Sequence, residues 1–499
     1  MIKEYKINLE LTENIHKKLF SASFLMILTR LLVKSIGLVS IVITARLLTP
    51  EDFGLIAIAM AIYGFIELFS SFGLATVLIQ KSDADDDDYN TAWTFKVLFG
   101  VVSAALLIIL SPYIAKYFED LRLENLIYLI SLTALLNGFS NIGVINFQKD
   151  LNFKKEMKYQ VIPKFINFFV IVFLAYTLQS YWALAIGIVF GNFISFLASY
   201  LMHPHRSKFG LKSAKKLMSF SKWLILNNAL YYANEKLINL VIGKMLGTSA
   251  VGSYTMTNEI STIPSMEVAA PINKASFPVY SKLQSNLKEL RVAYLSTLSL
   301  SSSITIPAAI GIALIAPKLI STALGQSWVH VIYLMQLLAV ASLFSGLYSN
   351  ISYVFNALGK PKIPFYFGVC KVFSIYGFIY ILVPFYGVDG VGYSLILTSI
   401  MMLIITKITL KKFIRISLFN ISKSIFRPAL STLFMYIATF YLLSLELSTP
   451  LIDLLTQIVI SVIFYLTFSF SIWHLQNKPD GLEEKLISLI KSKIFKKSR

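Results

Sequence analysis

The sequence is poor in charged residues and in cysteine. Asp, Glu, Lys and Arg make up 14% of its 499 residues, whereas soluble globular chains carry about 25%. So few charged side chains cannot cover a water-facing surface, which excludes a soluble enzyme. The hydrophobic content of 56% excludes a disordered chain. The one cysteine, Cys370, rules out an internal disulfide.

Motifs for catalysis are missing as well. There is no Gly-x4-Gly-Lys-Ser/Thr loop, so the chain is not expected to drive itself with ATP. Neither a nucleophile elbow nor a zinc-binding helix occurs. The acidic run 83–88 imitates a metal site, but a solvated turn is the favoured interpretation, and His203 and His205 lack a third ligand nearby. The sequence therefore predicts no enzyme, no cofactor and no metal.

Long apolar runs dominate what is present. Hydrocarbon about 30 Å thick needs about 20 apolar residues for each helical crossing. Runs of this length without strict alternation favour helices over barrel strands, so we expect an all-α integral membrane protein with about 14 transmembrane helices. The predicted segments lie near 20–45, 53–79, 91–115, 124–147, 161–178, 181–202, 223–243, 252–273, 292–316, 329–358, 365–385, 388–409, 428–445 and 453–475.

The basic residues indicate the orientation. With a cytoplasmic amino terminus, Lys and Arg number 33 in the loops and ends expected inside and five in the loops expected outside. This bias is the positive-inside rule, and it predicts a multi-pass protein with both termini cytoplasmic. The net charge of +19 therefore indicates membrane orientation and not nucleic-acid binding.

Two basic segments frame the predicted helices, after a cytoplasmic N-terminal segment at 1–19. The largest inside loop, 203–222, separates six segments from eight and is predicted to be a basic cytoplasmic linker. The tail 476–499 alternates apolar residues such as Leu482 and Leu486 with lysines, so we expect an amphipathic segment on the anionic inner leaflet. A plain solvated tail fits this pattern equally well.

A short internal repeat supports two related bundles. Arg46-Leu47-Leu48 followed by Phe53-Gly54-Leu55 recurs as Lys244-Met245-Leu246 followed by Val251-Gly252-Ser253, at an offset of 198 residues. In both places a basic residue and leucine end one predicted helix and glycine opens the next. Repeats of this kind are typical of transporters, with the substrate path between the halves.

Charged residues inside the predicted spans need a partner, a wet cavity or a function. Arg30 and Lys34 stand one helical turn apart, so both lie on one face of the first helix. The functional interpretation is a cationic clamp for a phosphate-bearing ligand. The alternative is a pair neutralised by Glu67 of the second segment. Further candidates for a basic lining of the site are Lys96, Lys236 and Lys371.

Polar side chains at helical spacing predict a water-filled chamber. Helix–helix hydrogen bonding is the alternative interpretation. Pro264 and Pro271 are expected to break the eighth helix. The predicted chamber lining consists of Asn228, Tyr231, Tyr232, Asn239 and Asn258. The carboxylates predicted to carry a coupling proton or sodium ion are Glu67, Glu235, Glu259 and Glu267.

Several longer stretches resemble one bacterial family, the polysaccharide (O-antigen, Wzx-type) flippases of the multidrug/oligosaccharidyl-lipid/polysaccharide (MOP) exporter superfamily. The likeness covers roughly residues 20–410 and lies in the combination of motifs. The stretches are ARLLTPEDFGL at 45–55, ELFSSFGLA at 67–75, LIQ at 78–80, NFQKDLNF at 146–153, LINLVIG at 237–243, Leu246-Gly247, Gly252-Ser253-Tyr254, Phe277-Pro278 and NALGKP at 356–361.

The resemblance implies two six-helix lobes, 20–202 and 223–409, around a central cavity, with two extra transmembrane helices at 428–475. It implies ion-coupled alternating access that moves undecaprenyl-diphosphate-linked oligosaccharide across the cytoplasmic (inner) membrane for lipopolysaccharide or another surface polysaccharide. The expected partners are this substrate, a proton or sodium ion, membrane lipid, and the polymerase and chain-length machinery. A multidrug or cation antiporter of the same fold is the alternative function.

Overall fold

The structure is a computed structural model. It describes the backbone of residues 2–68, 73–81, 83–215, 221–443, 449–477 and 483–484, and the side chains of these from residue 25 onward except 221–225 and 442–443. All regular elements in these ranges are helical, which confirms the predicted all-α class. The chain forms two compact units, Met1–Gly252 and Ser253–Arg499, and each is described by itself. Most of the predicted tail 476–499 lies outside the described residues.

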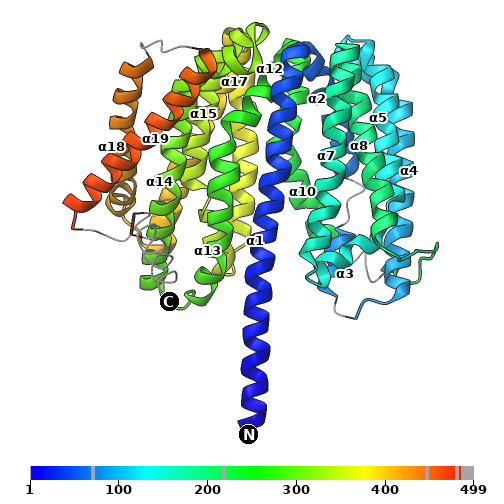
Figure 1. The fold of residues 1–499 in the computed structure, drawn as a ribbon, viewed down its shortest axis with the longest axis horizontal. Helices are drawn as coiled ribbons and strands as arrows, with labels where there is room; N and C mark the ends of the chain where they lie inside the picture. Colours follow the sequence, from blue (N-terminus) through cyan, green and yellow to red (C-terminus); the bar gives the residue numbers. More distant parts are fainter. Residues whose placement is uncertain are drawn as a thin grey trace. The chain divides into compact units, whose positions relative to one another are not determined.

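The first unit is built from antiparallel helix pairs. The pairs α4–α5 and α7–α8 pack side by side, and α1 packs along α7 (Figure 1). The helices of this unit are α1 (Ile2–Leu47), α2 (Pro50–Leu68), α3 (Leu74–Gln80), α4 (Asp86–Phe118), α5 (Arg122–Phe139), η1 (Ile142–Ile145), α6 (Asn146–Lys149), α7 (Phe153–Leu178), α8 (Tyr181–Met202), α10 (Ser221–Glu235) and α11 (Leu237–Leu246); α12 (Thr248–Ser261) runs on into the second unit.

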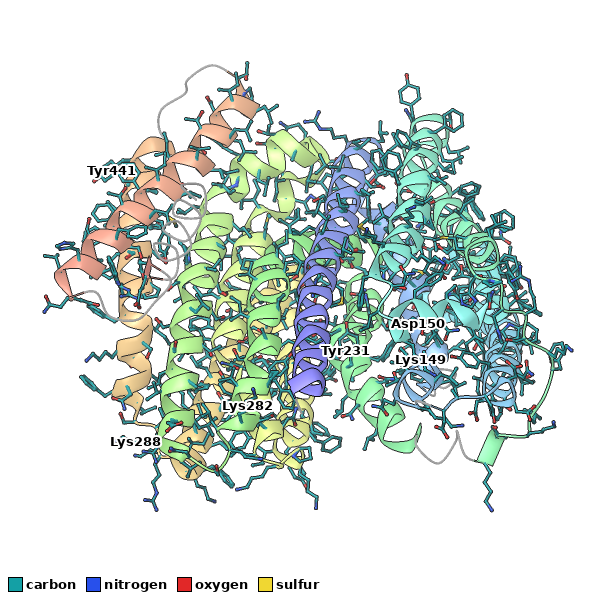
Figure 2. The ribbon with its side chains drawn as sticks, turned by 60° about the horizontal axis from the view of Figure 1, so that its bottom comes forward. Lys149, Asp150, Tyr231, Lys282, Lys288 and Tyr441 are labelled. Atoms are coloured by element: carbon teal, nitrogen blue, oxygen red, sulfur yellow. The ribbon has the colours of Figure 1, made fainter. Side chains whose placement is uncertain are left out.

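The second unit surrounds a core of large apolar side chains, among them Tyr280, Phe355 and Leu410. The last residue of α13, Lys282, and Lys288 in the first turn of α14 lie at the same end of this unit (Figure 2). Its helices are η2 (Pro264–Ala269), α13 (Ala270–Lys282), α14 (Leu287–Leu319), η3 (Ile320–Leu324), η4 (Gln326–Val331), α15 (Ile332–Tyr348), α16 (Ile351–Ala357), α17 (Lys362–Ile414), α18 (Leu418–Leu443) and α19 (Pro450–Leu475).

Within the described residues, each of the fourteen predicted segments contains helical structure, although several boundaries differ and the second segment is divided between α2 and α3. In the described part of the chain, eight helices are long and apolar enough to cross a membrane, or nine if α5 and the helical turn after its 68° bend form one span. The 53 residues of α17 would extend about 80 Å as a straight helix, far more than one crossing needs. Gly387 has non-helical backbone angles, and Gly390 packs against Leu382 and Val383, so α17 folds back on itself. Fourteen crossings stays a prediction.

The acidic run is the start of a helix. The Asp85 carboxylate caps α4 by accepting from the Asp88 backbone N–H at 2.9 Å. In turn, the Asp88 carboxylate accepts from the Asp85 backbone N–H at 3.2 Å. Carboxylates in a first turn are stabilised by the helix dipole. The carboxylate of Asp88 also pairs with Lys81 and is buried. The predicted solvated turn is therefore wrong for Asp88, which lies inside the structure as part of a cap.

The two prolines of the eighth predicted segment have different effects on the helix. Pro264 opens a π-helical turn, η2, whose flanking residues keep right-handed helical angles, and α13 continues directly from it. A missing N–H can be accommodated by a wider turn because the next donor bonds five residues back. The regular α-helix is therefore interrupted before Pro264 as expected, whereas Pro271 lies in the first turn of α13 and does not break it.

Two helix starts related by the internal repeat approach each other backbone to backbone. A Cβ atom added to Gly54 on α2 would lie 1.8 Å from the carbonyl oxygen of Thr248 on α12. One added to Gly252 would lie 1.7 Å from the carbonyl oxygen of Pro50. The 198-residue offset relates Pro50 to Thr248 and Gly54 to Gly252, so each glycine meets the first turn of the other copy. Only glycine allows this approach.

We expect Gly54→Ala and Gly252→Ala each to lower the free energy of unfolding by about 1–3 kcal/mol or more, because the new methyl group must push two helix backbones apart. The control is Gly37→Ala in α1, where an added Cβ has no atom within 4 Å. That change should be neutral or stabilising by about 0.5–1 kcal/mol. Thermal unfolding of the purified protein in detergent measures both; wild-type stability in Gly54→Ala would contradict the contact.

Candidate functional site

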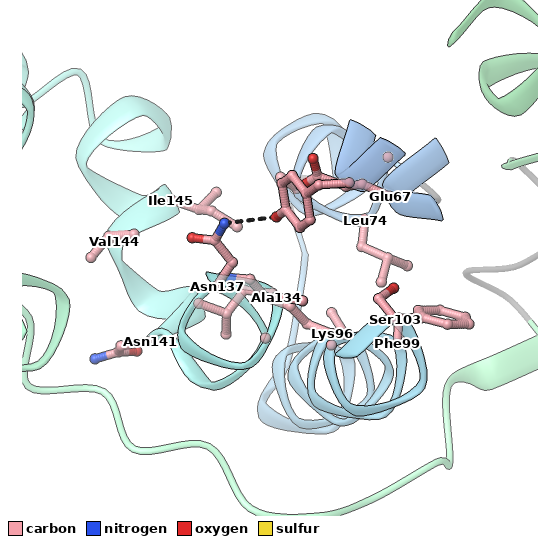
Figure 3. A pocket seen from close by; sticks show the side chains of 17 residues that line it. Glu67, Leu74, Lys96, Phe99, Ser103, Ala134, Asn137, Asn141, Val144 and Ile145 are labelled. Atoms are coloured by element: carbon pink, nitrogen blue, oxygen red, sulfur yellow. Dashed lines mark hydrogen bonds between the residues drawn. The ribbon is translucent and has the colours of Figure 1, made fainter. Parts of the chain in front are cut away.

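The first unit contains a cavity of about 320 Å³ between α2, α3, α4, α5 and η1. Most of its wall is apolar, with a few polar groups that converge on it, as ligand sites typically have. Figure 3 shows the side chains that line it. Its polar lining residues are Tyr63, Glu67, Lys96, Ser103, Asn137 and Asn141.

Two opposite charges face this cavity. Glu67 projects from α2 and Lys96 from α4, on different sides of the space, within electrostatic range of each other (Figure 3). The Lys96 ammonium donates to the hydroxyl of Ser140 and lies 3.5 Å from its carbonyl oxygen. The cation is therefore held by the chain just beyond α5 and balanced by a carboxylate, which offsets part of the cost of its partial burial.

Tyr63 and Asn137 complete the polar side of the cavity. Tyr63 lies one turn before Glu67, so both side chains leave the same face of α2. The amide of Asn137 on α5 donates to the Tyr63 hydroxyl at 3.0 Å (Figure 3). A carboxylate, an ammonium, a phenol and an amide thus share one small space. Such a set can bind an ion or exchange a proton.

Asn141 lies at the 68° bend between α5 and η1 and binds the chain there to other segments. Its side-chain amide donates to the carbonyl oxygens of Ser199 at 3.2 Å, His203 at 3.2 Å and His205 at 2.9 Å. Its side-chain oxygen accepts from the Gly143 backbone N–H at 2.9 Å. One buried side chain therefore joins the cavity floor to the end of α8 and to the linker. The sequence reasoning missed it because a single Asn in an apolar run gives no signal.

The described part of the linker lies against α4. Three backbone N–H groups donate to α4 side chains: Lys208 to Asn90 at 2.7 Å, Gly210 to Thr94 at 3.0 Å and Ser213 to Thr91 at 3.2 Å. The linker is therefore bound to the first unit along its course.

Two of the predicted site residues line the charged cavity, and the others lie elsewhere. Glu67 and Lys96 face the space described above, whereas Arg30 and Lys34 on α1 are not among the residues that line it. The side chain of Arg30 is exposed and that of Lys34 is half-buried. The clamp stays a prediction.

The polar stripe of the seventh predicted segment is split by a break at Lys236, between α10 and α11. Lys236 is exposed, and Asn228 and Glu235 are half-buried. Tyr231 is 65% exposed, whereas Tyr232 is buried and its hydroxyl donates to the Ala61 carbonyl at 2.9 Å. Tyr232 therefore helps to pack α10 against α2.

Asn239 on α11 is buried. The remaining candidates belong to the second unit. Asn258, Glu259, Glu267 and Lys371 are half-buried there, with Glu267 in the π-helical turn η2. The roles predicted for all of these residues stay predictions.

Sequence reasoning also missed a buried ion pair in the second unit. Arg427 lies inside α18, which begins ten residues before the predicted segment 428–445. Its guanidinium lies 3.0 Å from Glu483 of the tail, and both side chains are buried. Polar and charged residues before position 428 lower the mean hydropathy of that region. The predicted segment therefore began later than the helix does.

The sequence was compared with protein families and with individual known proteins, and both comparisons found matches. The family described as "Polysaccharide biosynthesis protein" matches residues 43–333, more than half of the chain. The chain is 24% identical over 395 residues to "Lipopolysaccharide biosynthesis protein WzxC" of Escherichia coli (strain K12), covering 78% of this chain and 80% of that protein. It is 23% identical over 384 residues to "Teichuronic acid biosynthesis protein TuaB" of Bacillus subtilis (strain 168), covering 75% and 79%.

Among solved structures, the lipid II flippase MurJ in an inward closed conformation has the same fold. The TM-score is 0.73 at 17% identity, and the match covers 91% of this chain and 99% of that one. The resemblance inferred from the sequence motifs is confirmed.

We expect Glu67→Gln to lower the free energy of unfolding by about 1–3 kcal/mol, because it leaves the half-buried Lys96 ammonium without its carboxylate. Lys96→Met should cost no more than about 1 kcal/mol, because the Glu67 side chain that it leaves behind is exposed. The double variant should recover most of the loss in Glu67→Gln. Thermal unfolding of all three proteins, with exposed Lys164→Met on α7 as control, measures the coupling. Losses that simply add in the double variant would show that the two charges do not interact.

Acid should weaken the attachment of the linker. Burial, with nearby positive charge on His205 and Lys155, lowers the pKa of His203 below its usual value. Its Nδ1 accepts from the His205 backbone N–H at 3.1 Å, a bond that the protonated ring cannot accept. Because the unfolded chain binds the proton more readily, stability should fall as pH drops below about 6.5.

Thermal unfolding between pH 7.5 and 5 measures this effect. His203→Asn keeps an acceptor without a titratable group and should reduce the acid loss. Burial also lowers the pKa of His205, so that histidine should keep its own smaller share. His474→Asn, at an exposed position in the last turn of α19, should leave it unchanged. An equally steep acid loss in His203→Asn would rule out this histidine as the cause.

Proposed function

The chain belongs to the polysaccharide biosynthesis protein family, and from this premise we propose that it is a flippase. Its cargo is an undecaprenyl-diphosphate-linked oligosaccharide, which it moves across the bacterial cytoplasmic membrane for a surface polysaccharide such as O-antigen. The family match over residues 43–333 carries the proposal. The names of the similar proteins, in lipopolysaccharide and teichuronic acid biosynthesis and in lipid II flipping, support it.

The cationic side chains receive the diphosphate. A doubly charged headgroup cannot enter hydrocarbon without compensation, and Arg and Lys supply it through charge-assisted hydrogen bonds. Arg30 and Lys34 share one face of α1 and form the clamp. The remaining cationic groups assigned to the path are Lys96, Lys236 and Lys371.

Alternating access moves the cargo between leaflets by rocking the lobes 20–202 and 223–409 against each other. The chain acts as a carrier and not as an enzyme. Both termini, the linker 203–222 and the tail 476–499 face the cytoplasm, where basic residues meet anionic lipid headgroups. The polymerase and chain-length machinery take over the cargo on the outer side.

A coupling ion acts through the carboxylates Glu67, Glu235, Glu259 and Glu267, and Glu67 has the best-defined surroundings. Lys96 can be balanced either by the Glu67 carboxylate or by a phosphate of the cargo. When Glu67 takes up a proton, its hold on Lys96 weakens and the ammonium becomes available to an anion. This competition links ion binding to cargo binding. The charged cavity that both residues line supports it.

We expect Arg30→Ala/Lys34→Ala to abolish most polymer export, because the headgroup loses its clamp. Export is measured as polymer on the cell surface together with lipid-linked precursor retained in the cytoplasmic membrane. The matched control is Lys164→Ala, an exposed cation on α7 outside the proposed path. Normal export by the double variant at wild-type protein levels would refute the clamp. Unchanged polymer with altered drug accumulation in a deletion strain would instead favour the antiporter.

A further inference from the structure

The second unit contains a row of buried polar side chains that the proposed flippase site does not use. Along α19 every fourth residue from 453 to 469 is polar and buried. Successive members lie one above the other, and because four residues slightly exceed one turn the row winds gradually around α19 by about 160° over its length. Four steps of about 6 Å span about 24 Å, most of the hydrocarbon thickness. The residues of this polar row are Asp453, Gln457, Ser461, Tyr465 and Ser469.

Hydrogen bonds join the row to its neighbours at several levels. The hydroxyl of Ser461 lies 2.8 Å from that of Thr439 on α18, and Tyr465 donates to the Ser303 carbonyl on α14 at 2.5 Å. Ser469 donates to the carboxylate of Glu483. The row is therefore the seam along which α19 meets α18 and α14.

The seam has unused hydrogen-bonding capacity and adjoining space. The side-chain oxygens of Gln457 and Ser431 and the Nε of Arg427 are buried and have no hydrogen-bond partner among the residues that the structure describes. Buried groups of this kind normally bind water. A cavity of about 380 Å³, many times the roughly 30 Å³ that one water occupies, touches both Ser461 and Tyr465. The cavity therefore adjoins the turn of α19 that separates the hydroxyl groups of Ser461 and Tyr465.

Ionisable groups stand at both ends of the row. At the end that the basic-residue pattern places inside, Glu483 faces Arg427 at 3.0 Å, with Ser469 and Tyr465 beside it. At the other end Asp453 lies in the first turn of α19. There η3 packs against α19, and Lys318, in the last turn of α14 just before η3, has a buried ammonium. Between the ends the row carries neutral amide and hydroxyl groups.

We propose that the polar row is a proton pathway through the α18–α19 hairpin. Asp453 takes up a proton at the predicted outer end. Each hydroxyl or water along the row accepts a proton on its oxygen and passes its own proton onward, and Glu483 releases one at the predicted inner end. One proton enters and one leaves, and no other bond changes. The fixed charge of Arg427 returns Glu483 to its ionised form and repels metal cations.

The pathway goes beyond the flippase site and rests on the proposed function only for its use, which is to admit the proton that drives transport. Its physical basis is independent of the cargo. A mostly apolar cavity could instead hold a hydrocarbon chain, and the experiment separates the two.

Proton flux through the purified full-length protein tests the pathway. The protein is reconstituted in vesicles with a trapped pH dye, and a potassium diffusion potential drives protons inward. Wild-type vesicles should acidify faster than empty ones. Asp453→Asn and Ser461→Ala should each slow acidification about tenfold or more, because each removes one relay group. Glu484→Gln, at the exposed neighbour of Glu483, should keep the wild-type rate.

Ser461→Ala removes a single hydroxyl, so its result holds even if Asp453→Asn fails to fold. Wild-type flux no greater than that of empty vesicles would overturn the pathway, as would unchanged flux in a folded Ser461→Ala. Ser461→Leu fills the cavity; normal proton flux with reduced transport of lipid-linked sugar would assign the cavity to a hydrocarbon chain and refute the pathway. Normal proton flux in vesicles that move no lipid-linked sugar would refute the flippase and support the pathway.

Discussion

The cost of leaving a polar group unpaired at membrane depth governs this structure. Charges that would be unremarkable on a soluble protein are here held in defined surroundings. Lys96 is bound to Ser140 and balanced by Glu67, and Arg427 lies against Glu483. Each arrangement joins segments far apart in the chain. The same interactions that make burial tolerable therefore also determine where the helices meet.

The two units satisfy this constraint differently. In the first unit opposite charges, Glu67 and Lys96, face one cavity. In the second unit hydroxyls and an amide lie along a helix seam between ionisable groups at its two ends. The first arrangement suits recognition of a charged headgroup and the second suits movement of a proton.

The helical class, the approximate segments and the family were predictable from the sequence, because mean hydropathy and motif order are properties of local stretches. The surroundings of the site were not. Glu67 and Lys96 were both singled out, but their shared cavity depends on the way α2, α4 and α5 pack. The turn near Gly387 was predicted as the boundary between the segments 365–385 and 388–409, close to Pro384, whereas the helix break at Lys236 has no proline or glycine beside it. The buried row on α19 was visible as a four-residue spacing from Asp453 to Ser469, yet a hydropathy average does not register it.

The glycine contact between α2 and α12 bears on the origin of the chain. A contact in which residue i of one copy meets residue j of the other, and the reverse, is self-complementary. Two identical single-length polypeptides could make it as a homodimer before any gene duplication fused them. After fusion, enlargement of either Gly54 or Gly252 strikes a carbonyl in the opposite copy. The two glycines therefore protect one and the same backbone contact, each from its own copy of the repeat.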